Sequence, residues 1–222
     1  MSNAADSRFL ATMCASEPRL CFITNRLETP DSLPGRVERI LAAGTPYVML
    51  REKDLAPDQL TEMALKLAEM VGRCEARLIV NSGPAAARAA GAWGLQLPFE
   101  VFLKTGRGPE LAGFNLGVSI HSLEEALEAR RAGADYLLAG HIFATDCKLG
   151  QPGRGLDFLR DLRRRIDLPL WAVGGITPAN IGEVLAAGAD VACVRSSLTT
   201  TPDPAGLAGA YLSAIQAAAL IS

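Results

Sequence analysis

No uninterrupted apolar stretch in this 222-residue chain approaches the roughly 20 residues needed to span a bilayer, although 49% of its residues are hydrophobic. We therefore expect a soluble protein with no membrane partner. The length suits one domain, because a single apolar core can still cover a chain of this size. We expect one domain over residues 1–222, in which residues 1–18 form a flexible N-terminal segment.

The cysteine pattern of a disulfide scaffold or zinc site is also missing. The five cysteines are an odd number, lie far apart and include no Cys-x-x-Cys pair. This usage is typical of a reducing compartment, so we expect a cytoplasmic protein. The cysteines are Cys14, Cys21, Cys74, Cys147 and Cys193.

A concentration of positive charge is likewise absent. The formal net charge is −2, and the densest basic run, Arg163-Arg164-Arg165, falls late in a predicted helix, where a solvated face explains it. Nucleic acid is therefore not an expected partner.

A short repeat appears at four places in the chain. Each copy is a small-residue helix end, then a glycine, then an apolar run of strand length, as expected of a helix closed by a left-handed glycine and followed by a strand. The copies are Ala42-Ala43-Gly44 before 47–50, Ala89-Ala90-Gly91 before 93–97, Arg131-Ala132-Gly133 before 135–138 and Ala186-Ala187-Gly188 before 190–194.

Four further apolar runs lie between these copies and bring the expected strands to eight. They are 20–24, 77–81, 115–119 and 169–173. The segments between strands have helical periodicity, and Thr29-Pro30, Ser122 and Thr177-Pro178 resemble helix N-caps. The order predicts an α/β protein built as a single (βα)8 TIM barrel.

An open, doubly wound sheet is the competing architecture. Such sheets usually carry a glycine-rich phosphate turn after the first strand, where this chain has Asn25-Arg26-Leu27-Glu28. Its glycine pair, Gly174-Gly175, follows the seventh expected strand instead, where barrels place phosphate sites. The barrel is favoured.

In a barrel, the residues that follow the carboxyl ends of the strands form the active site. Both histidines of the chain occupy such positions, His121 after the fifth strand and His141 after the sixth. An imidazole there can transfer protons near neutral pH, although either ring could merely order a loop. We take both as candidate catalytic residues, His121 before His141.

Two strand ends favour a phosphate site. Gly174 and Gly175 precede a predicted helix, and Ser196 and Ser197 open the last loop, so backbone N–H groups and hydroxyls could converge on an anion. The alternative is a pair of ordinary tight turns. The coincidence of both features at the seventh and eighth strands favours phosphate.

Other polar residues at the same end are candidate ligands for an anionic substrate. Arg51 and Lys53 end the second strand, Asn81 ends the third, and Lys148 lies in the long loop after the sixth. A nucleophilic Cys147 beside Lys148 is the less common alternative to a spare thiol.

At these residues the chain resembles the thiamine phosphate synthase superfamily, from about Leu20 to Pro204. The resemblance rests on an ordered set of markers rather than on any single one. They are Arg51-Glu52-Lys53, Asn81, Gly133-Ala134-Asp135-Tyr136, Val173-Gly174-Gly175-Ile176 and Gly188-Ala189-Asp190.

The sequence departs from the synthases of that superfamily at their magnesium ligands. The resemblance implies aspartates after the third and fourth strands, where this chain has Ser82 and Val101. A diphosphate leaving group needs its charge neutralised, normally by a metal. At these two positions the sequence therefore lacks the metal ligands on which the synthase reaction depends, and we expect no metal and no cofactor.

The stretches around the two histidines resemble instead the thiazole tautomerase branch of the superfamily. That resemblance implies an isomerase of thiamine biosynthesis that aromatises a carboxythiazole phosphate by a proton shift, with His121 as the catalytic base. The expected partner is a small phosphorylated thiazole.

Two alternatives remain open. One is a thiamine phosphate synthase, a transferase that joins a pyrimidine diphosphate to a thiazole phosphate, with Glu52, Glu100 or Asp146 as substitute metal ligands. The other is a non-catalytic regulator that binds thiazole phosphate. A homodimer is possible in each case.

Overall fold

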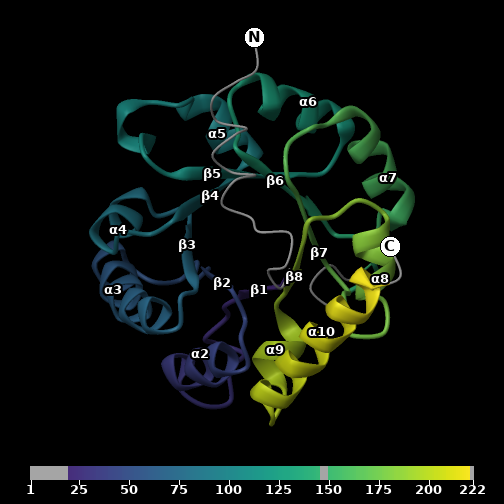
Figure 1. The fold of residues 1–222 in the computed structure, drawn as a ribbon. Helices are drawn as coiled ribbons and strands as arrows, with labels where there is room; N and C mark the ends of the chain where they lie inside the picture. The colour runs from purple at the N-terminus through teal and green to yellow at the C-terminus, as the bar shows by residue number, and fades with distance from the viewer. Residues whose placement is uncertain (1–19, 146–149, 221–222) are drawn as a thin grey trace.

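The computed structural model describes residues 20–145 and 150–220. Its eight parallel strands pair in chain order, and β8 pairs with β1 to close the barrel (Figure 1). All eight expected strands are confirmed. They are β1 (Leu20–Ile23), β2 (Tyr47–Leu50), β3 (Arg77–Asn81), β4 (Gly94–Pro98), β5 (Asn115–Ile120), β6 (Tyr136–Gly140), β7 (Leu170–Val173) and β8 (Val191–Val194).

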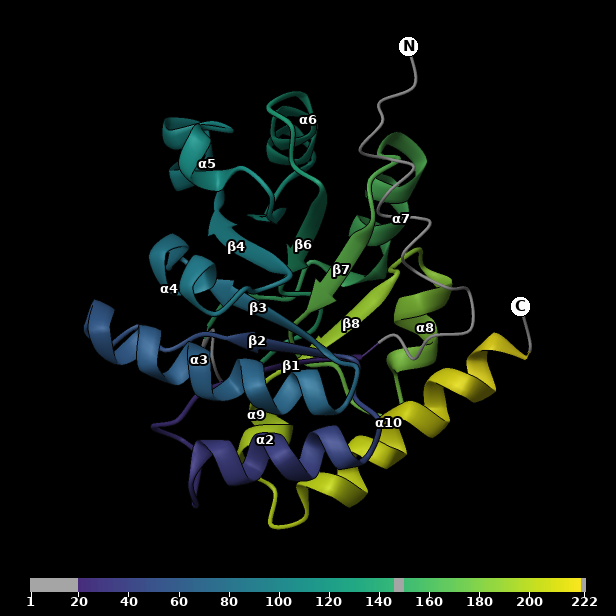
Figure 2. The same cartoon turned by 60° about the vertical axis from the view of Figure 1, so that its left-hand side comes forward.

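Helices surround the strands, as Figure 2 shows from the side, and α10 packs against α2 and α8. They are α2 (Leu33–Ala42), α3 (Pro57–Arg73), α4 (Pro84–Ala89), α5 (Phe99–Thr105), the 3-10 helix η1 (Pro109–Leu111), α6 (Leu123–Arg131), α7 (Gly155–Arg165), α8 (Ile181–Ala186), α9 (Ser196–Thr200) and α10 (Pro204–Ala219). No helix in the described ranges combines the length and apolarity that crossing a membrane requires.

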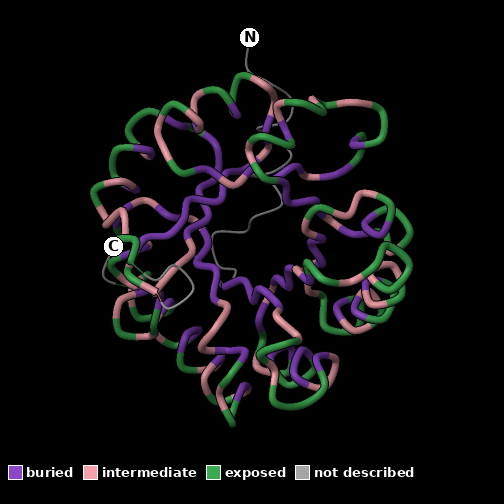
Figure 3. The backbone as a smooth tube through the Cα atoms, turned by 180° about the vertical axis from the view of Figure 1, so that it is seen from behind, coloured by how far each residue is buried: buried purple, intermediate pink, exposed green. Residues whose placement is uncertain are grey.

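Alternation along the strands gives two apolar layers, because successive side chains of a strand point to opposite faces. One layer lies between strands and helices, and the other fills the barrel. Figure 3 shows that the chain is buried along most of the barrel. Inside, the Trp171 ring lies 5.0 Å from that of Tyr47 and 4.6 Å from that of Tyr136, measured between centroids. These rings make the barrel interior a packed core.

The repeated glycines end helices as expected, with φ of 93° at Gly44, 58° at Gly91, 92° at Gly133 and 109° at Gly188. Among the expected caps, Ser122 accepts a hydrogen bond from Glu125 N and begins α6. The other two are wrong, because Ser32 caps α2 and Asn180 precedes α8. The seventh loop is therefore longer than expected.

Candidate active site

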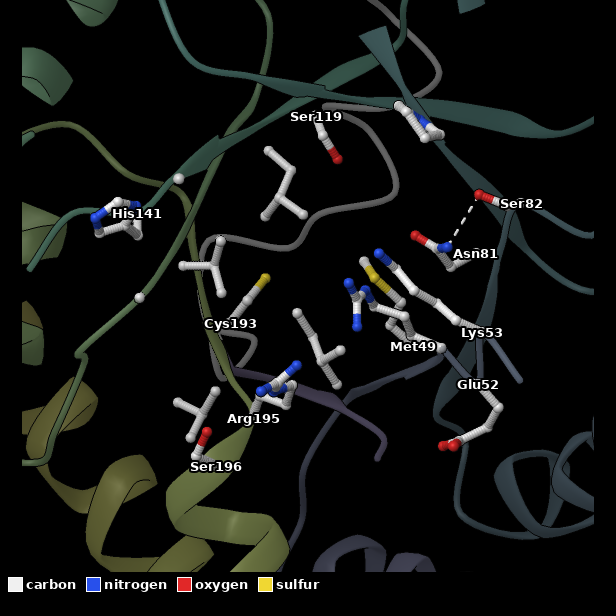
Figure 4. Close-up of a pocket in the computed structure, with 18 of the residues that line it drawn as sticks. Met49, Glu52, Lys53, Asn81, Ser82, Ser119, His141, Cys193, Arg195 and Ser196 are labelled. Atoms are coloured by element: carbon white, nitrogen blue, oxygen red, sulfur yellow. Dashed lines mark hydrogen bonds between the residues drawn. The ribbon is translucent and has the colours of Figure 1, made fainter. Parts of the chain in front are cut away.

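A cavity of about 1280 Å³ opens at the carboxyl ends of the strands, and each of the eight strands contributes to its lining. Its apolar floor includes Ile23, Met49, Leu138 and Cys193, which belong to the core inside the barrel. Polar side chains from the strand ends stand around this floor (Figure 4). The expected site residues that the structure describes all line this one cavity: Arg51, Lys53, Asn81, His121, His141, Gly174, Gly175, Ser196 and Ser197.

The segment after β2 is fixed by Glu52, which is buried. Its carboxylate accepts hydrogen bonds from Thr24 Oγ1 at 2.6 Å and from Arg26 N at 3.0 and 3.1 Å. Thr24 Oγ1 in turn accepts from Arg51 N at 2.9 Å. Glu52 thus joins the ends of β1 and β2, and the flanking Arg51 and Lys53 line the cavity.

Asn81 and Ser82 end β3 at the cavity edge. Asn81 Nδ2 donates to Ser82 Oγ at 3.0 Å, and Ser82 N donates to Gln96 O on β4 at 2.9 Å. Ser82 has φ of 59°, a left-handed backbone conformation that residues other than glycine, asparagine and aspartate seldom adopt. Such backbone positions often occur at ligand-binding edges.

The two histidines differ in their surroundings. His121 is about half exposed, and its Nδ1 lies 3.4 Å from Glu125 Oε2, which also accepts from His121 N at 2.6 Å. His141 is buried, and its Nε2 lies 3.3 Å from the carbonyl oxygen of Gln151. Both rings line the cavity, but each is also engaged by its own loop.

The glycine pair after β7 is required by close packing. A Cβ on Gly174 would lie 2.4 Å from His141 Cβ, and one on Gly175 would lie 2.7 Å from Ala144 O. The pair therefore lets the loop after β6 approach the loop after β7. This is a structural reason for the two glycines beside the phosphate site that the sequence analysis favoured.

The loops after β7 and β8 are also joined to each other. Tyr211 of α10 donates its hydroxyl to Ile176 O at 2.8 Å, and that hydroxyl lies 2.9 Å from Ser197 Oγ. Burial raises the pKa of Tyr211. Sequence reasoning missed this residue because it lies far along the chain in an apolar helix.

The structure does not describe every residue named in the sequence analysis. Outside the described ranges lie the candidate ligands Lys148 and Asp146, the thiol of Cys147, and the N-terminal segment 1–18.

The model of the thiamine monophosphate synthase family matches residues 20–198. This chain belongs to that family. The thiamine-phosphate synthase of Methanocella arvoryzae is 37% identical over 172 residues, which are 77% of this chain and 81% of that one. The synthase of Chlorobium phaeobacteroides is 36% identical over 198 residues, or 87% and 94%.

A solved structure of the family has the same fold. The thiamine phosphate pyrophosphorylase from Pyrococcus furiosus superposes with a TM-score of 0.79 at 30% identity and covers 90% of this chain and 96% of that one.

The expectation of a thiazole tautomerase is wrong, because relatives similar over most of the chain are named thiamine-phosphate synthases. That expectation relied on short stretches around His121 and His141 and on two positions that lack aspartate. One or two positions at the end of a barrel do not determine which reaction it catalyses, because residues at other strand ends can supply the charges that the reaction needs.

The described residues do not fit the magnesium ion that the family's synthases imply. Within residues 20–145 and 150–220 no group of three or more His, Cys, Asp or Glu side chains is placed to hold a metal. Both Glu52 oxygens already accept hydrogen bonds, and Glu100 is absent from the cavity lining.

Proposed function

We propose that this protein is a thiamine-phosphate synthase, a transferase that joins a pyrimidine carried on a diphosphate to a thiazole phosphate. The observation that carries the proposal is the two-part polar lining of one cavity in a member of this family. Arg51, Lys53 and Asn81 stand at the ends of β2 and β3, and Gly175 and Ser196 stand at the ends of β7 and β8.

The two groups suit two different anions. Arg51 and Lys53 present charge and N–H donors to a diphosphate, and the Asn81 amide adds a neutral hydrogen-bonding group. The loops after β7 and β8 offer backbone N–H groups and the Ser196 hydroxyl to a monophosphate. α8 and α9 have six and five residues, so the proposal rests on these local donors rather than on a helix dipole.

The size of the cavity supports two substrates bound together. Sites for one small molecule occupy about 300 to 1000 Å³, and this cavity of about 1280 Å³ exceeds that range. Its apolar floor, which includes Met49 and Leu138, suits the faces of two aromatic rings. Binding both rings there converts a bimolecular encounter into a reaction between neighbours.

The transfer balances without an oxidant or a reductant. A thiazole ring nitrogen donates its electron pair to the carbon that bears the diphosphate, and the carbon–oxygen bond breaks with its pair passing to the diphosphate. Arg51 and Lys53 would stabilise the negative charge that develops on the leaving oxygen. No proton has to move between ring atoms, so His121 and His141 are assigned contact with substrate only.

The test uses the full chain with a pyrimidine diphosphate and a thiazole phosphate. We expect joined product by mass spectrometry and one equivalent of released pyrophosphate. Lys53→Met should lower kcat/KM for the diphosphate about tenfold or more, because a charge-assisted contact is lost. Lys66→Met, an exposed position on α3, should stay within about twofold of the parent.

Failure to form product while thiazole phosphate binds would refute the synthase assignment. Equal activity of Lys53→Met and Lys66→Met would refute the placement of the diphosphate at β2.

A further inference from the structure

Among the described residues, the lining of the cavity carries more cations than carboxylates. Among the described lining residues, the permanent cations are Arg51, Lys53 and Arg195, and the carboxylate is Glu52. Glu52 directs both oxygens to Thr24 and Arg26 N, in the join between β1 and β2. The described part of this cavity therefore offers an anion an excess of positive charge.

Arg195 is the cation that family markers and sequence patterns do not single out. It follows β8 directly and precedes α9, and its side chain is 21% exposed. Its Nη2 lies 3.7 Å from Oε1 of Glu28, in the loop after β1. The guanidinium thus extends from β8 toward the end of β1, the strand that lies between β8 and β2 in the barrel.

Figure 4 shows the result of this direction. The Arg195 guanidinium and the Lys53 amine both point toward the middle of the cavity, whereas the Glu52 carboxylate points away from it.

We propose that Arg195, together with Arg51 and Lys53, supplies the positive charge that a divalent metal ion would otherwise bring to the diphosphate, so that this protein binds a diphosphate without Mg²⁺. The inference rests on the proposed function, since it assigns the diphosphate of that reaction to this group of cations. It follows from two observations together: the described residues include no group of side chains that could hold a metal ion, and three permanent cations line this one cavity.

The chemistry of arginine suits this task. A guanidinium presents a planar fork of N–H donors that matches two oxygens of a phosphate, and it stays charged at every relevant pH. The pair with Glu28 is partly exposed, with 46% of the Glu28 side chain accessible, so exchanging it for a diphosphate oxygen costs little. A lysine in the same place would retain the charge but lose the fork.

The experiment measures calorimetric binding of inorganic pyrophosphate to the full chain, once with a metal chelator and once with excess Mg²⁺. We expect binding in the chelator, with a Kd no more than about threefold weaker than in Mg²⁺. Arg195→Gln should weaken pyrophosphate binding about tenfold or more when the chelator is present. The affinity of Arg195→Lys should fall between those of Arg195→Gln and the parent.

Two comparisons show that the loss is local. Arg164→Gln, on α7 and outside the cavity lining, with its side chain 71% exposed, should leave pyrophosphate affinity unchanged. In Arg195→Gln the affinity for thiazole phosphate should stay within about twofold of the parent, which also reports that the barrel is folded.

Three results would overturn the inference: pyrophosphate binding that requires Mg²⁺, unchanged pyrophosphate affinity in Arg195→Gln, or an equal loss of thiazole phosphate affinity in that variant. The last would place Arg195 in the monophosphate site. Failure of the proposed function looks different, because pyrophosphate would bind in the chelator while no joined product forms with or without Mg²⁺. Product formation that stops on chelation would instead preserve the function and refute the inference.

Discussion

Replacing Asp135 should destabilise the barrel without affecting its chemistry. Asp135 N donates to Leu116 O at 2.8 Å, and Leu116 N donates back to the Asp135 carboxylate at 2.7 Å. Arg107 completes the arrangement, because it pairs with the carboxylate and its Nε donates to Gly133 O at 3.1 Å. The group lies at the amino end of β6, opposite the cavity.

The magnitude follows from burial. Leu116 is fully buried and the Asp135 side chain is 12% exposed, so removing the carboxylate leaves a buried N–H without its acceptor. A hydrogen bond to a charged group contributes about 1.5 to 3 kcal/mol, and a partly exposed pair with Arg107 adds at most about 1 kcal/mol. Asp135→Ala should therefore cost about 3 kcal/mol, which lowers the melting temperature of a chain of this length by about 6 to 12 °C.

Urea denaturation and thermal melting measure the effect. Asp135→Asn keeps an acceptor for Leu116 N and should lose about half as much. Asp157→Ala, with a side chain 91% exposed, should change stability by less than about 0.5 kcal/mol. The reasoning is refuted if Asp135→Ala is as stable as Asp157→Ala, or if its activity per folded molecule falls.

Three further outcomes are expected. Gly117→Ala should cost about 3 kcal/mol or more in urea denaturation, because its Cβ would lie 2.1 Å from Tyr136 Cζ in the packed barrel interior. Tyr211→Phe should weaken thiazole phosphate binding severalfold in calorimetry and leave pyrophosphate binding unchanged, because the hydroxyl joins Ser197 to Ile176. The free energy of unfolding should fall as the pH rises above about 10. Burial raises the pKa of Tyr136 and Tyr211, so only the unfolded chain then loses those protons. Tyr136→Phe should make the free energy of unfolding less dependent on pH, as measured by urea titrations at several pH values.

The strand order could be predicted because each strand is marked by residues close to it in the sequence. A left-handed glycine such as Gly133 needs no partner elsewhere in the chain, and the apolar run after it is buried whichever strand lies beside it. Helix starts were less predictable. Thr177-Pro178 resembles a cap, but the Thr177 N–H donates to Asn180 Oδ1 and the helix begins only at Ile181.

The candidate site could be predicted as a set of positions but not as a set of roles. Strand ends identify which residues surround the cavity, although the expected site residues did not include Arg195. What the sequence does not show is the direction of each side chain: Glu52 points toward β1, and Arg195 reaches Glu28 in the loop after β1. These directions depend on Thr24 and Glu28, which are far from them in the chain and carry no recognisable pattern.

The family markers show the same division between stability and chemistry. Gly188-Ala189-Asp190 repeats the arrangement at Asp135. Asp190 N donates to Leu170 O at 2.7 Å, and Leu170 N donates to the Asp190 carboxylate at 2.8 Å. Arg163 Nε donates to Gly188 O at 3.0 Å. Both copies lie at the amino ends of strands, where a barrel needs stability and performs no chemistry. Matching these markers therefore identifies the scaffold and says nothing about the reaction. The reaction has to be argued from the opposite end, where the charges that face the cavity decide which anion it can hold.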